Sequence, residues 1–312
     1  MRNHRQSPLS RRGYLPFAAV LLLGSTAAHA VPLSLYAAGS LSAALTKVAV
    51  DYTAATGTPV TTTFQASGTI RQEIEAGTVH PDVFASADTG NPLTLRQEGL
   101  SGPVVNFASN RVVAVAKSSL GLTSATILST LLSPSISIGT STPVSDPLGD
   151  YTEQVFSLAD GLSPGAKSTL DAKAKRLVGG PASPPVPAGQ NSLVYFVDVT
   201  AQANVFLTYY TSAVAALALD TNLVSVDLPS NLAVAAQYGE TVLNGANPAA
   251  QSLADYILSP AAQAVLASNG FGPPAAVPEP KSWVLLAIGL VALVIWPRHL
   301  AQGRNRPASN AI

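Results

Sequence analysis

The stretch Leu33-Ser34-Leu35-Tyr36-Ala37-Ala38-Gly39-Ser40-Leu41 decides the fold that we predict for this chain. Its alternating apolar residues give way to small ones, and an apolar-periodic segment follows through Leu45 and Val48. This pattern predicts a buried strand that leads through a tight turn into a helix. The start of a helix has unpaired backbone N–H groups and a positive potential, so such a turn can bind an anion. Ser40 is either a ligand there or simply the helix cap, which is the commoner role of a serine at such a position.

The same pattern recurs in the next part of the chain. Residues 58–64 are rich in β-branched side chains and predict a second strand. The small turn 65–69 contains Ser67, and residues 70–77 predict a helix that ends at Gly77. Two strand–turn–helix units with a serine at each turn favour a shared ligand site over two unrelated caps.

The remaining elements alternate in the same way. Further strands are expected at 81–88, 110–116, 136–139 and 205–210, and helices at 151–158, 193–199 (capped by Asn191-Ser192) and 249–267, with a proline-rich loop at 179–190. This order predicts an α/β fold of mostly parallel sheets with helices on both faces. Ligands of such sheets bind beyond the carboxyl ends of the strands.

Two segments are placed to cross between two lobes. They are 110–116 and 232–236, so we expect one lobe from residues 31–109 and 237–276, and a second lobe from residues 110–236. A hinge between two lobes allows closure over a bound solute.

Composition excludes several classes of function. Residues 31–276 contain nine Lys and Arg against sixteen Asp and Glu, a net charge of about −7, so nucleic acid is not an expected partner. The chain has no cysteine, and His80 is the only histidine in this range, which argues against thiolate or zinc sites and serine–histidine catalysis. Asp82 and Asp88 stand at opposite ends of a short strand, where capping is a commoner role than paired catalysis. We expect neither an enzyme nor a cofactor.

The two ends of the chain have the pattern of targeting segments. Residues 1–30 contain Arg11 and Arg12, an apolar run and the small-x-small sequence Ala28-His29-Ala30, which predict an export signal of either the twin-arginine or the ordinary kind. Residues 277–312 begin with Val277-Pro278-Glu279-Pro280, followed by an uncharged apolar run and a basic tail. This arrangement resembles the PEP-CTERM sorting signal that exosortases process; the alternative is a plain transmembrane anchor. Either version places the protein in the periplasm or cell envelope.

The segment 31–274 resembles the periplasmic molybdate-binding component of ABC importers. The matching pieces keep the order of that family: Tyr36-Ala37-Ala38-Gly39-Ser40-Leu41, Phe64-Gln65-Ala66-Ser67-Gly68-Thr69, Ile74-Glu75-Ala76-Gly77, Asp82-Val83-Phe84-Ala85-Ser86-Ala87-Asp88, Asp146-Pro147-Leu148-Gly149-Asp150-Tyr151, Val205-Phe206-Leu207-Thr208-Tyr209, Leu258-Ser259-Pro260 and Gly270-Phe271. The resemblance implies a two-lobed type II periplasmic binding protein, monomeric, with an ABC permease and ATPase as partners.

The resemblance also implies the site. By position in the motifs, Ser40, Ser67 and Tyr209 match the hydroxyl ligands of molybdate or tungstate, and Leu148 and Asn191 match residues that donate through the backbone. Neutral donors at helix N-termini suit a dianion that carries no proton. Two features depart from the family: Gly68 stands where a third serine is frequent, and Leu148 is bulkier than usual. Asp146 and Asp150 near the third loop keep phosphate open as a ligand.

Other functions therefore remain open at this stage. The site could hold another oxyanion, such as sulfate, phosphate or chromate. The unusual tail also fits a surface-displayed protein built on a binding-protein scaffold.

Overall fold

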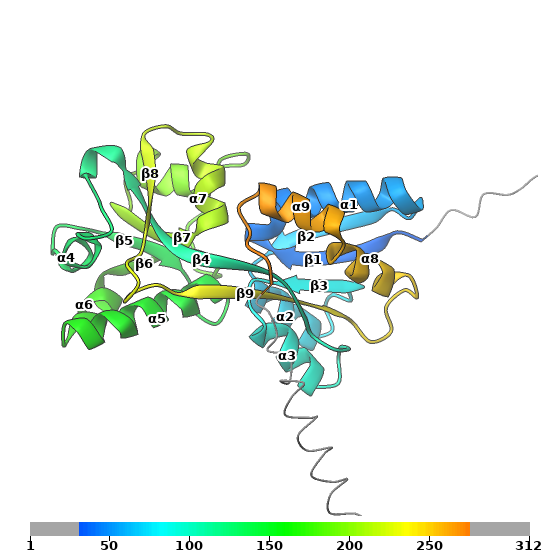
Figure 1. Ribbon diagram of the computed structural model, residues 1–312. Coiled ribbons are helices and arrows are strands. Elements are labelled where there is room, and N and C mark those ends of the chain that lie inside the picture. Colours follow the sequence, from blue (N-terminus) through cyan, green and yellow to red (C-terminus); the bar gives the residue numbers. More distant parts are fainter. Residues whose placement is uncertain (1–30, 275–312) are drawn as a thin grey trace, which may run out of the picture. The chain divides into compact units, whose positions relative to one another are not determined.

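The computed structural model describes residues 31–274, which form an α/β fold (Figure 1). The predicted export signal at 1–30 and the predicted sorting segment at 277–312 lie outside the described residues. Within the described range, no helix combines the length and the hydrophobicity that crossing a membrane requires.

The strands of the described residues are β1 (Leu33–Ala38), β2 (Val60–Gln65), β3 (Val83–Ser86), β4 (Val105–Lys117), β5 (Ile138–Ser141), β6 (Ala174–Val178), β7 (Val205–Tyr209), β8 (Leu223–Asp227) and β9 (Ala235–Val242). The predicted strands occur in the expected order, whereas β6 and β8 were not predicted.

The helices alternate with them. The α-helices are α1 (Ser42–Thr56), α2 (Ser67–Glu75), α3 (Gly90–Gln97), α4 (Ile127–Leu132), α5 (Pro147–Leu162), α6 (Ala166–Lys173), α7 (Tyr210–Leu217), α8 (Ala250–Ile257) and α9 (Pro260–Ser268). Shorter turns are the 3₁₀ segments η1 (Gly39–Leu41) and η2 (Ser118–Leu120) and the π-helical η3 (Val194–Val199).

The strands pair in the order β2-β1-β3-β9-β4-β7-β5-β6, with β8 beside β4. The outer pairs β1–β2, β1–β3, β5–β6 and β5–β7 are parallel, whereas β9 is antiparallel to both β3 and β4. Figure 1 shows α1, α8 and α9 on one face of the β1–β3 part of the sheet and α2 and α3 on the other. The carboxyl ends of β1, β2 and β3 therefore lie at one edge, between helices on both faces.

Strand β4 connects the two halves of the sheet. Its first part, Val105 to Arg111, pairs with β9, and its second part pairs with β7 and β8 from Val112 or Val113 onward. The crossing expected at 110–116 lies inside this strand, and the return expected at 232–236 leads into β9. The proposed division into residues 31–109 with 237–276 and 110–236 stays a prediction.

Several helices differ from their predicted bounds. The helix expected over 70–77 begins at Ser67 and ends at Glu75. The single helix expected over 249–267 is wrong: α8 ends at Ile257 and α9 begins at Pro260. Proline lacks an N–H, so it suits the first turn of a helix and interrupts a longer one; Ser259 caps the second helix by accepting a hydrogen bond from the Ala262 N–H at 3.3 Å. Helix α5 begins at Pro147 rather than at 151, because Asp146 is its N-cap.

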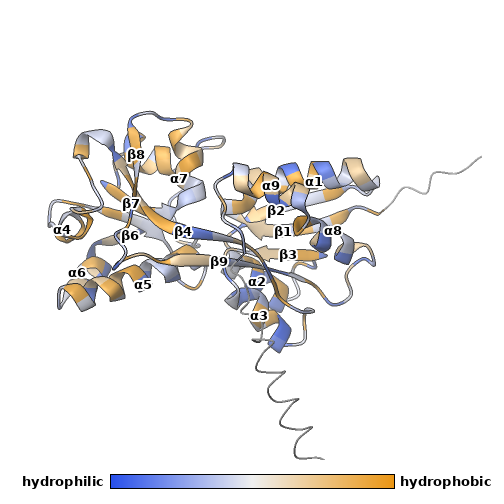
Figure 2. Ribbon diagram, in the orientation of Figure 1, coloured by the Kyte–Doolittle hydropathy of each residue, from blue (hydrophilic) through white to orange (hydrophobic). Residues whose placement is uncertain are grey.

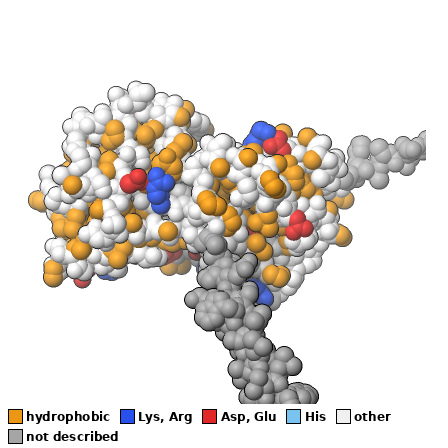
Figure 3. Space-filling view, in the orientation of Figure 1, with side chains coloured by type: hydrophobic (Ala, Val, Ile, Leu, Met, Phe, Trp, Pro, Cys, Tyr) orange, Lys and Arg blue, Asp and Glu red, His pale blue; other side chains and the backbone are white. Residues whose placement is uncertain are grey.

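The core is aliphatic and aromatic. Figure 2 shows hydrophobic residues along β3 and β4, whereas α1 and α8 carry both polar and apolar residues. Strand β1 alternates fully buried Leu33, Leu35 and Ala37 with half-buried residues, as expected for a sheet covered on one face more than on the other. The face drawn in Figure 3 has few and scattered charges, in keeping with a chain of which 11% is charged.

Candidate functional site

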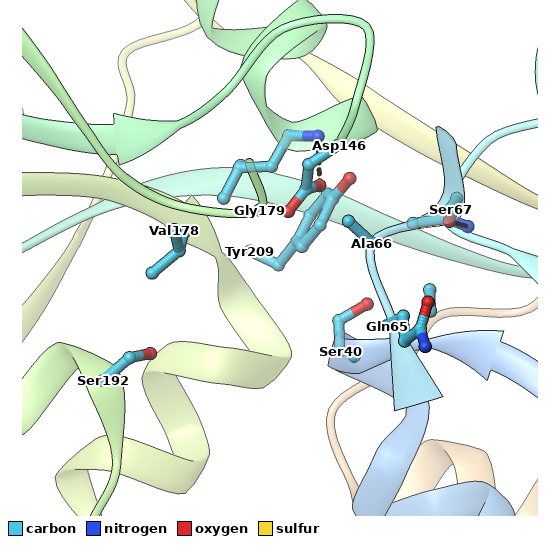
Figure 4. A pocket seen from close by; sticks show the side chains of 13 residues that line it. Ser40, Gln65, Ala66, Ser67, Asp146, Val178, Gly179, Ser192 and Tyr209 are labelled. Carbon is cyan, nitrogen blue, oxygen red and sulfur yellow. Dashed lines mark hydrogen bonds between the residues drawn. The ribbon is translucent and has the colours of Figure 1, made fainter. Parts of the chain in front are cut away.

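A cavity of about 240 Å³ lies at the carboxyl edge of the strands (Figure 4). We call it the hydroxyl cavity. Its lining residues are Ala38, Gly39, Ser40, Gln65, Ala66, Ser67 and Ala87 from the β1–β3 part, and Asp146, Leu148, Val178, Gly179, Ser192 and Tyr209 from the β5–β7 part. Four of the five residues predicted for the site, Ser40, Ser67, Leu148 and Tyr209, are thus brought together by the fold.

Ser40 lies in η1, directly after β1. Its Oγ is 2.8 Å from the Tyr238 hydroxyl, which also accepts a hydrogen bond from Asn110 Nδ2 at 3.2 Å. When Tyr238 donates to Ser40, the Ser40 hydrogen is free for a ligand in the cavity. Ser40 makes no side-chain capping bond to α1, so the structure does not use it as a cap.

Ser67 is the first residue of α2 and is buried, with 1% of its surface exposed. Its Oγ accepts a hydrogen bond from the Ala87 N–H at 3.1 Å, which fixes the side chain and leaves its own hydrogen to donate. The first N–H groups of a helix have no partner within the helix. The hydroxyl and the start of α2 therefore offer donors at the same place.

Tyr209 ends β7, and only 3% of its surface is exposed. Its ring packs edge-on against Tyr151 and Tyr238, with centroids 6.2 Å and 5.7 Å apart. Its hydroxyl is buried and has no hydrogen-bond partner within residues 31–274. Burial raises the pKa of the Tyr209 hydroxyl well above its ordinary value, so the group stays protonated and able to donate.

Leu148 borders the cavity, but its backbone N–H already has a partner. Asp146 caps α5, and its Oδ1 accepts from the Leu148 N–H at 3.0 Å. Donation from Leu148 to a bound anion stays a prediction, and an anion there would share this N–H with the carboxyl group. Desolvation raises the pKa of Asp146, while hydrogen bonds with Ser141 and Leu148 oppose the shift; once protonated, Asp146 is a donor too.

Asn191 does not line the cavity. Its Oδ1 accepts hydrogen bonds from the N–H groups of Leu193 and Val194 at 2.9 and 3.3 Å, so its side chain caps η3. The next residue, Ser192, borders the cavity instead and lies across it from Ser40 (Figure 4). Donation from the Asn191 backbone to a ligand stays a prediction, and Ser192 is the residue of this segment that lines the cavity.

Sequence reasoning also missed Gln65 and Gly179. Gln65 ends β2, and its buried Oε1 has no partner among the described residues. Its place at the end of a strand, two residues before Ser67, was the available signal. Gly179 has a φ of +75°, and a Cβ there would lie 2.3 Å from Ser141 Oγ, so only glycine fits this wall of the cavity.

The two sides of the hydroxyl cavity also touch directly. The Thr69 N–H in α2 donates to the Ser145 carbonyl oxygen at 3.2 Å. A Cβ at Gly68 would lie 2.0 Å from the Val144 carbonyl oxygen. This close approach explains why no serine stands at position 68, and Val144 itself has an unusual φ of +69°.

The cavity therefore combines hydroxyl groups and helix N-termini without a Lys, Arg or His in its lining. The family of bacterial extracellular solute-binding proteins matches residues 33–272, which is most of the chain. This chain belongs to that family. Members of such a family bind solutes for transport and are not enzymes.

One curated protein and several solved structures are similar to this chain. An uncharacterized protein of Pasteurella multocida (strain Pm70) is 33% identical over 177 residues, which are 56% of this chain and 72% of that protein. The periplasmic molybdate-binding protein of Azotobacter vinelandii has a similar structure, with a TM-score of 0.62 and 20% identity, over 78% of this chain and 99% of that one. The sulfate-binding protein SubI of Mycobacterium tuberculosis H37Rv also has a similar structure, with a TM-score of 0.64 and 17% identity, over 79% of this chain and 88% of that one.

These likenesses confirm the fold. The chain has the α/β, type II periplasmic binding protein fold, with its sheet flanked by helices.

Proposed function

We propose that this solute-binding protein captures molybdate, and also tungstate, for an ABC importer. The observation that carries the proposal is the Tyr209 hydroxyl, a buried donor that has no partner among the described residues, in a cavity that also holds the Ser40 and Ser67 hydroxyls. A buried polar group without a partner costs free energy, so a ligand that accepts from Tyr209 gains that free energy back. A tetrahedral dianion offers acceptors in every direction.

The lack of a basic side chain in the cavity fits the same ligand class. Burying a lysine would carry a large desolvation cost, whereas hydroxyls and helix N-termini bind anions at little cost. The likeness to the molybdate-binding protein of Azotobacter vinelandii supports molybdate in particular. The same proposal includes export through residues 1–30 and a periplasmic location. It also includes a monomeric state, an ABC permease and ATPase as partners, and exosortase processing or anchoring at 277–312.

A second candidate is an oxyanion that keeps a proton, such as hydrogen phosphate. Asp146 favours it, because an ionised carboxyl group in the lining can accept that proton but repels a fully ionised dianion. Sulfate is the further alternative, with SubI of Mycobacterium tuberculosis H37Rv as a structural relative.

Calorimetric titration of the protein with molybdate, tungstate, sulfate and phosphate tests the proposal. We expect molybdate and tungstate to bind with dissociation constants below about 1 µM and sulfate and phosphate to bind far more weakly. If only sulfate or phosphate binds tightly, the proposed oxyanion site stands and the proposed ligand is wrong. Binding of none of the four would overturn the proposal and favour a surface protein on this scaffold.

The serine ligands have their own test. Ser40→Ala and Ser67→Ala each remove one donor, and we expect each to weaken molybdate binding by about tenfold or more, since hydrogen bonds to charged groups contribute about 1.5–3 kcal/mol. Ser168→Ala, on the exposed side of α6, is the matched control. Unchanged affinity in both cavity variants would contradict the assignment.

A further inference from the structure

A second cavity, of about 370 Å³, lies between the end of β9, the start of β4 and helix α8. We call it the Glu240 cavity. It shares no lining residue with the hydroxyl cavity. Pro103, Val105, Ala254 and Leu258 give it apolar walls, and Val105 and Leu258 are exposed at its rim.

Glu240 is the unusual residue of this cavity. Only 1% of its surface is exposed, and neither carboxyl oxygen has a hydrogen-bond partner within the described part of the chain. Successive side chains of a strand point to opposite faces. Tyr238, two residues earlier in β9, packs against Phe107 and Phe271, so Glu240 shares its face and is directed toward α8.

Other polar side chains of this cavity already donate hydrogen bonds, although the amide groups of Asn244 and Gln251 each keep one of their two hydrogens. The Thr241 hydroxyl donates to the carbonyl oxygens of Gly102 and Pro103, both at 3.1 Å. Gln251 Nε2 donates to Asp255 Oδ1 at 2.9 Å, and Asn244 Nδ2 donates to the Gly99 carbonyl oxygen at 2.7 Å.

Acceptors outnumber the remaining donors. The acceptors are the side-chain oxygens of Asn244, Glu240, Gln251 and Asp255, and the two oxygens of Glu240 have no partner among residues 31–274. A ligand with donors and a positive charge therefore fits this cavity.

We propose that the Glu240 cavity binds a small organic cation, a primary ammonium or guanidinium group carried on a short apolar chain. The cationic head would donate to Glu240, and the chain would lie against the apolar walls. A metal ion fits less well: within residues 31–274 there is no group of three or more His, Cys, Asp or Glu that could hold one, and the cavity is much larger than an ion.

Burial and the negative charge of Asp255 raise the pKa of Glu240 well above its ordinary value. Its strand neighbours on the same face, Ala85 and Val105, do not titrate, so Asp255 on α8 is the charged group that acts on it. This raised pKa favours the protonated form of Glu240 when no ligand is bound. Binding of a cation stabilises the carboxylate, and one proton leaves Glu240 for the solvent.

Titration of the full protein with n-butylammonium chloride at pH 7 tests the proposal by calorimetry. We expect saturable binding whose enthalpy changes with the ionisation enthalpy of the buffer, because a proton is released. Tetramethylammonium has the same charge but no N–H donor, and we expect it to bind at least about tenfold more weakly. Equal binding of the two cations, or no binding of n-butylammonium, would overturn the proposal.

Variants assign the binding to this cavity. Glu240→Gln should weaken n-butylammonium binding at least tenfold and leave molybdate binding unchanged. Glu98→Gln, the same change at an exposed residue outside the cavity, should alter neither. Asp255 is exposed on α8, and Asp255→Asn should weaken n-butylammonium binding severalfold, with thermal melts to verify folding. Wild-type affinity in Glu240→Gln and Asp255→Asn, or tight Glu240-dependent binding of CaCl₂ or MgCl₂ in place of the ammonium ion, would each contradict the proposed ligand.

Discussion

The two cavities of this protein are opposites in chemistry. The hydroxyl cavity is lined by Ser40, Ser67 and Tyr209, which can donate hydrogen bonds, and the start of α2 lies at its wall. The Glu240 cavity lies beside the middle of a strand and one face of α8, and it presents acceptors. The first contains the buried Tyr209 hydroxyl and Gln65 Oε1, and the second contains the buried Glu240 carboxyl group; none of them has a hydrogen-bond partner among residues 31–274. The two proposed ligands have opposite charges because the groups that border each cavity differ.

The largest predicted effect on molybdate binding comes from a substitution at Gly68, where the two sides of the hydroxyl cavity touch. Gly68→Ser adds a hydroxyl where the molybdate-binding family often has one, so a count of donors predicts tighter binding. Its Cβ, however, would lie 2.0 Å from the Val144 carbonyl oxygen and 2.8 Å from that of Ser145. Neither backbone atom can rotate away, so we expect a cost at the upper end of the usual 1–3 kcal/mol for overpacking, and roughly 100-fold weaker molybdate binding.

The control for this variant is Gly161→Ser. Gly161 is exposed in α5, and a Cβ there meets nothing within 4 Å. Calorimetry measures molybdate affinity in both variants, and thermal melts verify that both are folded. The comparison separates a clash between the two sides of the cavity from a loss of stability. Equal or tighter molybdate binding by Gly68→Ser would show that the two sides of the cavity can move apart without loss.

Removal of the Tyr209 hydroxyl tests the central donor directly. Tyr209→Phe deletes one oxygen and keeps the packing of the ring against Tyr151 and Tyr238. We expect about 10- to 100-fold weaker oxyanion binding, because a hydrogen bond to a charged group contributes about 1.5–3 kcal/mol. The melting temperature without ligand should stay equal or rise, since the hydroxyl has no partner in the described residues.

Tyr256→Phe makes the same chemical change outside both cavities, at a ring that packs on Tyr52. It should leave oxyanion binding unchanged. A Tyr209→Phe protein that binds as tightly as the wild type would remove the observation on which the proposed function rests.

Asp146 is the one acidic group in the lining of the hydroxyl cavity, and it predicts a smaller, pH-dependent effect. Its pKa is raised by burial, and it disfavours a dianion only when ionised. Molybdate affinity of the wild type should therefore fall severalfold as the pH rises through the pKa of Asp146. Asp146→Asn keeps an oxygen for the Leu148 N–H and cannot ionise, so its affinity should vary much less with pH.

Titrations at several pH values between 6 and 8.5 check this, with phosphate beside molybdate. If hydrogen phosphate is the cargo instead, Asp146→Asn should lose phosphate binding, because the acceptor for the ligand's proton is gone. Parallel pH profiles for the two proteins would show that Asp146 only caps α5.

The sequence indicated which elements meet at the hydroxyl cavity, because these elements are built from local motifs. Ser40 and Ser67 each follow a strand and precede a helical segment, and the carboxyl ends of parallel strands meet at one edge. At the start of η3 the cavity is lined by Ser192 and not by Asn191, whose side chain accepts from the Leu193 N–H, and donation by the Asn191 backbone stays a prediction. The engagement of the Leu148 N–H by Asp146 also depends on side-chain geometry that spacing does not show.

The Glu240 cavity could not have been predicted in this way. Within β9, Glu240 shares a face with the apolar Tyr238 and Val242, but glutamate is rarely buried in proteins, so its burial was not expected. Only the packing of α8 over this face buries it. The division of 249–267 into two helices places α8 there, and the effect of Pro260 was likewise missed.

The smallest predicted effect concerns stability and belongs to the Glu240 cavity. Glu240 has a pKa raised well above 4.5, so the folded protein binds more protons than the unfolded chain at and above that pH. Its contribution to the free energy of unfolding is therefore fully present below about pH 4.5 and is lost as the pH rises toward the folded pKa. Glu240→Gln lacks this slope, so its melting temperature should exceed that of the wild type by a few degrees at pH 8 and by less at pH 4.5.

Thermal melts of wild type, Glu240→Gln and the control Glu98→Gln between pH 4.5 and 8 measure this difference, and every other titrating group is common to the three proteins. If the melting temperatures of wild type and Glu240→Gln vary with pH in the same way, burial does not raise the pKa of Glu240. If the profiles differ, adding n-butylammonium should narrow the gap at pH 8 by stabilising only the wild type, because a bound cation stabilises the ionised carboxylate in the folded state. The same addition should leave the gap at pH 4.5 unchanged, since there Glu240 keeps its proton and the cation has no charge to pair with.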